Sequence, residues 1–292
     1  MTMLKRTALG LSIAAAFGLS TAVFAEEPAA MAPAAHQEMH QEMHKEGHAE
    51  AAAEMKDAGH AAAPAHHAPH WSYEGEGGPV SWGKLDEKFA LCETGKQQSP
   101  IDISAANVTT LDNIEIHYAA SPLSVKNNGH TIQVNYAPGS TIKVGDAQYD
   151  LLQFHFHTPS EESIGGKRYD MVAHFVHKTA DGKLGVIGLL LKVGAENAAL
   201  KAVFDNMPAE AEKENTVADA QVNAADALPK NLTYFNFAGS LTTPPCSEGV
   251  NWMVLANPAE ISQAQLDAFR KLFPMNARPI QPVNGRIVRL AN

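Results

Sequence analysis

The sequence from residue 71 to the C-terminus predicts a mainly β (α+β) fold with a few short helices. Eight segments have the length and the apolar, β-branched or aromatic content of strands. Turn sequences such as "NNGH", "APGS", "IGGK" and "ADGK" separate them. Only two segments have helical spacing, and about 220 residues is a size that one β-rich domain can reach. The expected strands are residues 114–118, 131–136, 140–144, 149–157, 169–178, 184–193, 233–240 and 250–256.

Two helices are expected, at residues 195–207 and 262–273. The second begins with Ser262 and Gln265 in the positions of a capping box and ends before Pro274. In the first, apolar residues recur at helical spacing. We expect these residues to pack in the core rather than to bind a cofactor: Leu200, Val203, Phe204 and Met207.

Residues 1–25 have the pattern of a secretory signal peptide. Lys5 and Arg6 precede an apolar run, and "AVFA" provides small residues for cleavage after Ala25. The run is too short for a stable membrane span, and no later stretch is long and apolar enough to be one. We therefore expect export to a periplasm, with no membrane attachment after cleavage.

The charge of the chain disfavours two classes of partner. The chain has 22 basic and 32 acidic residues, a formal net charge of −10, and loss of Lys5 and Arg6 lowers it to −12. So acidic a chain is a poor candidate for binding nucleic acid or an anionic lipid surface. Its only cysteines are Cys92 and Cys246. In an oxidising compartment such a pair favours a disulfide over two free buried thiols.

Residues 26–70 differ from the rest, since they contain no Phe, Tyr or Trp but eight of the fourteen histidines. This composition predicts a disordered or transiently helical tail. Four of its histidines recur at every fourth residue and would share one side of a helix, where they could bind Zn²⁺ or Cu²⁺. A solvated tether whose histidines bind nothing is the other interpretation. The four are His36, His40, His44 and His48.

The segment "QFHFH", residues 153–157, suggests a metal site. Side chains alternate faces along a strand, so His155 and His157 share one face while the two phenylalanines point to the other. The next expected strand carries His174 and His177 on opposite faces, and one of them could complete a three-histidine zinc site with a fourth position left for water. The residues alone leave two interpretations open, a metal site or ordinary polar strand residues.

Five motifs decide between these interpretations. "NNGH", "LQFHFHTPSEES", "AHFVH", "GSLTTPPC" and "QPVNGR" follow one another between "WSY" at Trp71 and the C-terminal region. Together they resemble the α-class carbonic anhydrases over nearly all of residues 71–292. The resemblance implies one domain around a large, mostly antiparallel twisted central sheet. It also implies zinc-dependent, reversible hydration of the small molecule CO₂ to bicarbonate, and it supports a Cys92–Cys246 bridge.

The resemblance also implies roles for particular residues. The zinc ligands would be His155, His157 and His174, with His177 structural. Thr242 and Glu161 would orient the nucleophile, and His130 would carry the proton away. An apolar substrate pocket would be formed by Val176, Val186, Leu241, Thr243, Val250 and Trp252, and water on the proton path would be ordered by Tyr73, Asn128 and Gln133. Considered alone, the pocket residues are core residues, Thr242 is a turn hydroxyl, and His130 is a surface histidine after an Asn-Gly turn.

Val172 departs from the family pattern. The family usually has glutamate two residues before the third ligand, where it can accept the second ring N–H of that histidine. Valine cannot accept a hydrogen bond, so we expect a water or a neighbouring carbonyl to replace it, or His174 to hold zinc less firmly. An alternative function follows, a periplasmic zinc- or copper-binding protein with weak residual hydratase or esterase activity. A different hydrolase using the same zinc chemistry, such as an esterase, is a third hypothesis.

Overall fold

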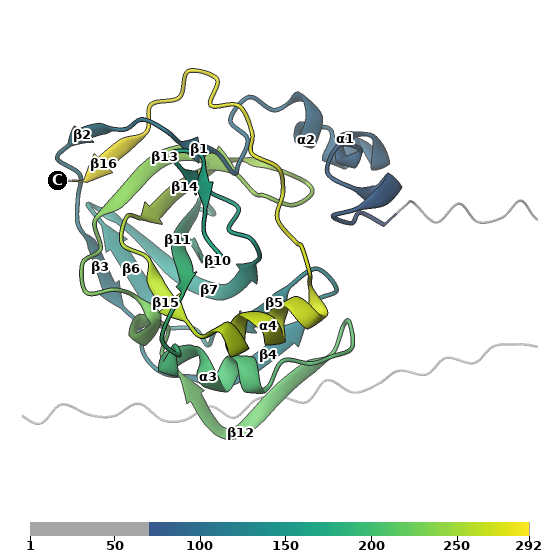
Figure 1. Cartoon of the computed structure of the whole chain (residues 1–292). Helices are drawn as coiled ribbons and strands as arrows, with labels where there is room; N and C mark the ends of the chain where they lie inside the picture. The colour runs from purple at the N-terminus through teal and green to yellow at the C-terminus, as the bar shows by residue number, and fades with distance from the viewer. Residues whose placement is uncertain (1–69, 292) are drawn as a thin grey trace, which may run out of the picture. The chain divides into compact units, whose positions relative to one another are not determined.

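A computed structural model describes residues 70–291 of the chain (Figure 1). The predicted signal peptide, the tail up to residue 69, and the tail histidines His36, His40, His44 and His48 lie outside the described residues. Within residues 70–291, no helix combines the length and the apolar character that crossing a bilayer requires.

Thirteen strands of the described chain form one twisted sheet. Along its main path the order is β12-β4-β5-β7-β10-β11-β14-β13-β16-β2. Most neighbours are antiparallel, whereas β11 pairs in parallel with β14 and β15, and β16 with β2. The mainly β prediction is confirmed. The strands are β2 (Asn107–Thr109), β3 (Ile114–His117), β4 (Ser121–Asn127), β5 (Ile132–Asn135), β6 (Thr141–Val144), β7 (Ala147–His157), β10 (Met171–Lys178), β11 (Leu184–Val193), β12 (Glu214–Val222), β13 (Tyr234–Ser240), β14 (Glu248–Leu255), β15 (Ala259–Ile261) and β16 (Arg289–Ala291).

A second, small sheet in the order β1-β8-β9 contains the segment that follows β7. β8 is parallel to β1 and antiparallel to β9. Its three strands are β1 (Asp102–Ile103), β8 (Ser163–Ile164) and β9 (Lys167–Arg168).

The helices are short and peripheral, as predicted. α4 has the predicted capping box, in which Ser262 accepts a hydrogen bond from the Gln265 backbone and Gln265 reaches back to the Ser262 backbone N–H. α3 is shorter than predicted, because Asn197 caps its start and the helix ends before Met207. The helices are α1 (Trp82–Leu85), α2 (Leu91–Thr94), α3 (Ala198–Asp205) and α4 (Gln263–Leu272), with 3₁₀ turns at η1 (Gly75–Gly77), η2 (Glu87–Phe89) and η3 (Ala224–Ala227).

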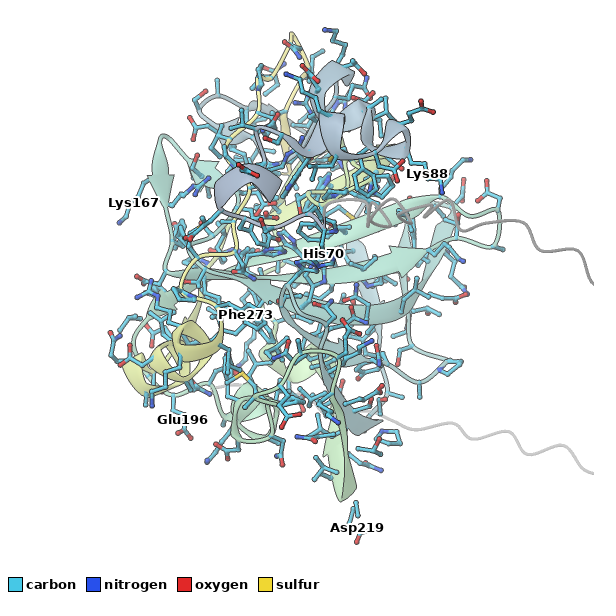
Figure 2. The ribbon with its side chains drawn as sticks, turned by 90° about the vertical axis from the view of Figure 1, so that its right-hand side faces the viewer. His70, Lys88, Lys167, Glu196, Asp219 and Phe273 are labelled. Atoms are coloured by element: carbon cyan, nitrogen blue, oxygen red, sulfur yellow. A yellow bond between two sulfur atoms is a disulfide. The ribbon has the colours of Figure 1, made fainter. Side chains whose placement is uncertain are left out.

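Two long strands, β4 and β12, were not among the predicted elements. β4 alternates buried and exposed residues as a half-buried strand should, but Pro122 interrupts its apolar pattern. β12 is a largely exposed strand at the end of the sheet, and its pairing with β4 is interrupted between Thr216 and Gln221. Its tip, marked by Asp219 in Figure 2, projects from the body of the domain. An edge strand whose apolar residues do not alternate regularly gives no periodic signal.

The two faces of β7 differ as the alternation predicts. Phe154 and Phe156 are fully buried in the main core, where Leu200, Phe204 and Phe269 of the two longer helices also pack. Each large apolar side chain buried in this way stabilises the fold by about 1.5–3 kcal/mol. The opposite face of β7 therefore carries its histidines on a firmly packed support.

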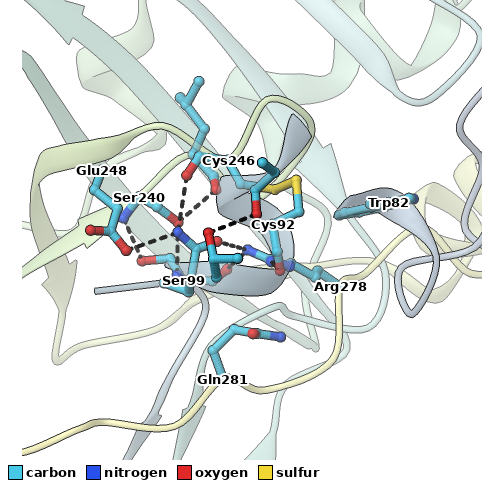
Figure 3. Close-up of a disulfide and its surroundings, with 12 residues drawn as sticks. Trp82, Cys92, Ser99, Ser240, Cys246, Glu248, Arg278 and Gln281 are labelled. Atoms are coloured by element: carbon cyan, nitrogen blue, oxygen red, sulfur yellow. Dashed lines mark hydrogen bonds between the residues drawn. A yellow bond between two sulfur atoms is a disulfide. The ribbon is translucent and has the colours of Figure 1, made fainter. Parts of the chain in front are cut away.

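The predicted disulfide between Cys92 and Cys246 is present. It connects α2 to the turn between β13 and β14, over a sequence separation of 154 residues (Figure 3). The fully buried Arg278 lies beside it and donates hydrogen bonds to the carbonyl oxygens of Cys92 and Ser99. The bridge therefore anchors the N-terminal segment against a turn that follows the central sheet.

Candidate metal centre

Three histidines of β7 and β10 converge on one point. β7 pairs antiparallel with β10, which places His155 directly opposite His174 and His157 opposite Val172. One ring nitrogen from each of His155, His157 and His174 can be chosen so that all three atoms lie within 4.8 Å of one another. His177 lies on the other face, where its ring contacts the Tyr118 hydroxyl at 2.5 Å and the Gly185 carbonyl oxygen at 3.2 Å.

The second ring nitrogens of the two β7 histidines have hydrogen-bond partners. His155 Nδ1 lies 2.8 Å from Gln153 Oε1, and His157 Nδ1 lies 2.7 Å from the Asn276 carbonyl oxygen. Both contacts leave Nε2 free for the shared point. His157 Nε2 is buried and has no hydrogen-bond partner within the described chain. An unpaired polar atom of this kind is costly unless a ligand satisfies it.

His174 is oriented the opposite way. Its Nε2 lies 3.2 Å from Glu162 Oε2, so Nδ1 is the atom directed to the shared point. Val172, on the same strand, is fully buried among apolar side chains. The partner of His174 is therefore a carboxylate, neither the water nor the carbonyl that we expected. Glu162 was not predicted, since nothing in the sequence indicates which residue of the "SEES" turn faces inward.

Burial keeps the β7 imidazoles in the form that binds metals. It lowers the pKa of His155 to about 3 and that of His157 well below its ordinary value, and the neighbouring His174 adds to both shifts. For His174, burial lowers the pKa, but the charge and hydrogen bond of Glu162 outweigh it and raise the pKa overall. Three imidazole ligands with an open fourth position suit Zn²⁺. The unpartnered His157 Nε2 makes this site fit such an ion.

Glu161 and Thr242 lie beside the triad. Glu161 is fully buried, accepts a hydrogen bond from the backbone N–H of Arg278 at 2.8 Å, and is hydrogen-bonded to the Thr242 side chain. Its Oε2 lies 3.5 Å from His157 Nε2. Burial raises the pKa of Glu161 to about 7, with the charge of Glu162 acting in the same direction. A carboxylate that accepts from Thr242 leaves the threonine oxygen free to accept a second hydrogen bond.

Thr243 lies in the wall of a polar cavity, and the other five predicted pocket residues form one apolar cluster. Val186, Val250 and Trp252 are buried in it, and Val176 and Leu241 pack against them. The Trp252 ring stands edge-on to the His174 ring, with 4.8 Å between centroids. The cluster therefore borders the triad on the side of β10, β11 and β14.

A cavity of about 140 Å³ leads to the triad from the other side. The structure brings the predicted residues Tyr73, Asn128, His130, Gln133 and Thr243 together in its wall. Besides Glu162, sequence reasoning missed three members of this site, and none has a local pattern that would reveal it. They are Trp71 and Thr131 in the wall, and Asn276, whose carbonyl holds His157.

The His130 ring lies in the wall of this cavity, where it stacks on Trp71 and has His70 beside it. Its centroid lies 3.6 Å from that of Trp71 at an interplanar angle of 11°, and 4.9 Å from that of His70. Burial lowers the pKa of His130 to about 4, with His70 lowering it further and Glu212 opposing the change. In this position the ring is neutral at pH 7 and accepts a proton less readily than a free imidazole.

Replacement of His70 with alanine should raise the pKa of His130 from about 4 towards 6.5. The change removes the neighbouring His70 ring, whose charge lowers the pKa of His130 in the native chain. An NMR titration of the His130 ring protons measures it, with His117→Ala as the control because His117 is an exposed histidine elsewhere. An unchanged His130 midpoint would contradict this account of the shift.

Comparison with known proteins agrees with this geometry. The profile of the family described as eukaryotic-type carbonic anhydrase matches residues 77–292. The carbonic anhydrase of Pectobacterium carotovorum is 45% identical over 78% of this chain and 93% of its own length. A hyperthermostable carbonic anhydrase from an active hydrothermal vent chimney is 47% identical, with a TM-score of 0.74 over 76% of this chain and 100% of that structure.

A further solved structure is the α-carbonic anhydrase of Thermovibrio ammonificans in complex with the inhibitor sulfanilamide. It is 42% identical, with a TM-score of 0.73 over 75% of this chain and 98% of that structure. The matched residues include the whole triad and the strands that carry it. The chain belongs to the eukaryotic-type, or α-class, carbonic anhydrase family.

Proposed function

We propose that this carbonic anhydrase hydrates CO₂ reversibly with a Zn²⁺ ion held by His155 Nε2, His157 Nε2 and His174 Nδ1. The observation that supports the proposal is that one ring nitrogen from each histidine lies within 4.8 Å of the other two, with His157 Nε2 buried and unpartnered within the described chain. When bound, zinc lowers the pKa of water to about 7 in carbonic anhydrases and so supplies a nucleophile at neutral pH.

The apolar cluster beside the triad suits the substrate. CO₂ has no net dipole, so Val186, Val250 and Trp252 can hold it against the nucleophile without a hydrogen bond. A new bond joins the water oxygen to the CO₂ carbon, and one proton leaves, which gives bicarbonate. The polar wall of the cavity is then available to bind water, through which the released proton can leave.

Thr242 and Glu161 orient the nucleophile. Because Glu161 accepts the hydrogen bond of the threonine hydroxyl, the Thr242 oxygen serves as an acceptor and fixes the direction of the attacking lone pair. The Arg278 backbone N–H fixes the position of the carboxylate itself. Thr243 lines the cavity next to it.

His130 passes the released proton to buffer. It lies in the wall of the cavity, and Tyr73, Asn128 and Gln133 line the path between it and the triad. Asn128 Nδ2 donates to Gln133 Oε1 at 3.4 Å, and Gln133 Nε2 donates to Asn135 Oδ1 at 2.7 Å. Each amide nitrogen carries two hydrogens, so both residues keep a second N–H for water. The role requires the ring to leave the stack with Trp71, since a pKa of about 4 suits release better than uptake.

We place the activity in a periplasm, which the N-terminal sequence pattern and the disulfide support. Metal binding by His36, His40, His44 and His48 stays a prediction. The alternative of a zinc- or copper-binding protein with residual activity is less well supported, because a metal buffer needs neither the Thr242–Glu161 pair nor a proton path.

The test is CO₂ hydration by the zinc-loaded full chain, followed by stopped-flow with a pH indicator. We expect hydration well above buffer, with inhibition by anions and aromatic sulfonamides that compete for the open zinc position. The His155→Ala chain is the control, because it keeps every tail histidine and removes one of the three triad ligands. A zinc-replete wild-type chain that hydrates CO₂ no faster than this control would overturn the proposal.

A further inference from the structure

We propose that Glu162 is the positioning residue that orients His174 for metal binding, in place of a partner on the histidine's own strand. The proposal rests on the proposed zinc site and assigns a role to a residue outside the ligand set. Glu162 Oε2 lies 3.2 Å from His174 Nε2, and both side chains are almost completely buried. No water is needed to join them.

Position 172 makes this role necessary. Val172 lies two residues before His174 and shares its face of β10, so an acceptor there would reach the ring. Valine offers none and packs into the apolar cluster instead. The only carboxylates within 4.0 Å of the His174 ring, among the described residues, are those of Glu162 and Glu161. Glu161 is already engaged by Arg278 and Thr242.

The hydrogen bond selects the orientation of the ring. A carboxylate only accepts hydrogen bonds, so the proton of neutral His174 sits on Nε2 and the lone pair on Nδ1. The two other histidines use the opposite arrangement, in which Nδ1 is held and Nε2 is free. Without Glu162, no hydrogen bond from residues 70–291 would hold the proton of His174 on Nε2.

The backbone around Glu162 is rigid enough to place the carboxylate. Ser160 Oγ donates to the Glu162 carbonyl oxygen at 2.7 Å and accepts from the Tyr169 backbone N–H at 2.9 Å. The next residue, Ser163, pairs with Asp102 of β1 in the small sheet, where its hydroxyl donates to the Asp102 carboxylate at 2.6 Å. The carboxylate therefore reaches His174 from the turn that leads into the small sheet.

The other oxygen of the same carboxylate indicates a functional purpose. Glu162 Oε1 is buried and has no hydrogen-bond partner within residues 70–291. A buried carboxylate with one unpaired oxygen costs stability, so an apolar residue here would favour the fold. A carboxylate bound to an imidazole ligand strengthens the ligand's donation to a metal, which gives the costly group a use.

Zinc release to a chelator tests the role. In Glu162→Ala the triad should release zinc about 10–100 times faster than in the wild type, and Glu162→Gln should fall between them. His155→Ala identifies the release phase that belongs to the triad, since the tail is intact in it. Glu248→Gln is the matched control: its carboxylate accepts hydrogen bonds from Gln97 and Gln98, away from the triad, and zinc release should be unchanged.

A double variant that moves the carboxylate from position 162 to position 172 distinguishes a role in orienting His174 from a role in supporting the fold. Val172→Glu combined with Glu162→Gln should restore slow zinc release, whereas Val172→Glu alone should not slow it. The zinc-free Glu162→Gln protein should melt close to the zinc-free wild type, while the rise in melting temperature caused by zinc should shrink. A structural role alone would lower the zinc-free melting temperature and leave the zinc-dependent rise unchanged.

Two results overturn the proposal in distinguishable ways. If the wild type has no release phase that depends on His155, the zinc site of the proposed function is wrong and this role fails with it. If that phase is present but has the same rate in Glu162→Ala, Glu162→Gln and the wild type, only the role of Glu162 is wrong.

Discussion

Replacement of His157 with alanine is expected to abolish both zinc retention and CO₂ hydration. The site would keep two of its three imidazoles, and the buried nitrogen that most clearly lacks a partner would be gone. Loss of an outer partner of a ligand typically costs 10–100-fold in affinity or activity. Loss of a ligand itself should therefore lower kcat/KM for CO₂ hydration by at least about 100-fold, measured by stopped-flow on protein dialysed against a chelator.

His177→Gln is the matched control for this loss. His177 is equally buried, lies on a strand of the same site, and faces away from the triad towards Tyr118. We expect its zinc content and hydration rate to stay near the wild-type values. Its free energy of unfolding should fall by about 1–3 kcal/mol, because a buried hydrogen-bond partner is lost. A His157→Ala chain that kept one chelator-resistant zinc and full activity would refute the proposed site.

Strand alternation was enough to predict two of the three histidines of the metal centre. His155 and His157 share one face because they are two residues apart, and the structure agrees. The third member depends on the register that sets His174 opposite His155. Neither segment encodes that register locally, and alternation alone offers His174 and His177 equally. The family resemblance resolved the choice.

The groups that hold the ring nitrogens were the least predictable part. The carbonyl that binds His157 Nδ1 belongs to Asn276, 119 residues away in sequence. The carboxylate that binds His174 comes from the turn after β7, although the missing acceptor at Val172 was evident from the sequence. Alternation shows that the acceptor for His174 is missing at position 172. Which residue replaces it depends on how the turn before the small sheet packs against the large sheet.

The fold shows the same division. Strands with a strong apolar pattern were predicted close to their observed bounds, and β11 was predicted over its full length. β12 was missed because most of its residues are exposed, its few apolar residues do not alternate regularly, and it has a neighbour on one side only. Such a strand is defined by its pairing with β4, and no pattern in its own residues indicates it.

Removal of the disulfide is expected to cause the largest loss of stability. The bridge closes a loop of 154 residues, for which the chain-entropy model gives roughly 5 kcal/mol and measured losses are typically about 2–5 kcal/mol. The Cys92→Ser, Cys246→Ser double variant should therefore unfold at a clearly lower urea concentration. Chemical denaturation of the zinc-loaded wild type and variant, with the slopes compared, measures the difference.

Without the disulfide, the N-terminal segment should loosen before the whole domain unfolds. Gln98 Nε2 donates to the Cys246 carbonyl oxygen, and Arg278 donates to that of Cys92, so part of the anchor survives without the bridge (Figure 3). The Cys246 backbone N–H donates to the Thr243 carbonyl oxygen, which places the bridge next to the turn that carries Thr242. We expect hydration activity to persist at 25 °C but to fail at a lower temperature than in the wild type.

A reducing agent supplies the control for this prediction. Cys92 and Cys246 are both buried, so a reducing agent should reach their disulfide only when the wild type unfolds. Reduction should then lower the stability of the wild type to that of the double variant. The double variant has no other cysteine and should not respond. If the variant were as stable as the oxidised wild type, the hydrogen bonds of Gln98 and Arg278 alone would hold the N-terminal segment in place. The covalent link would then contribute nothing to the native fold.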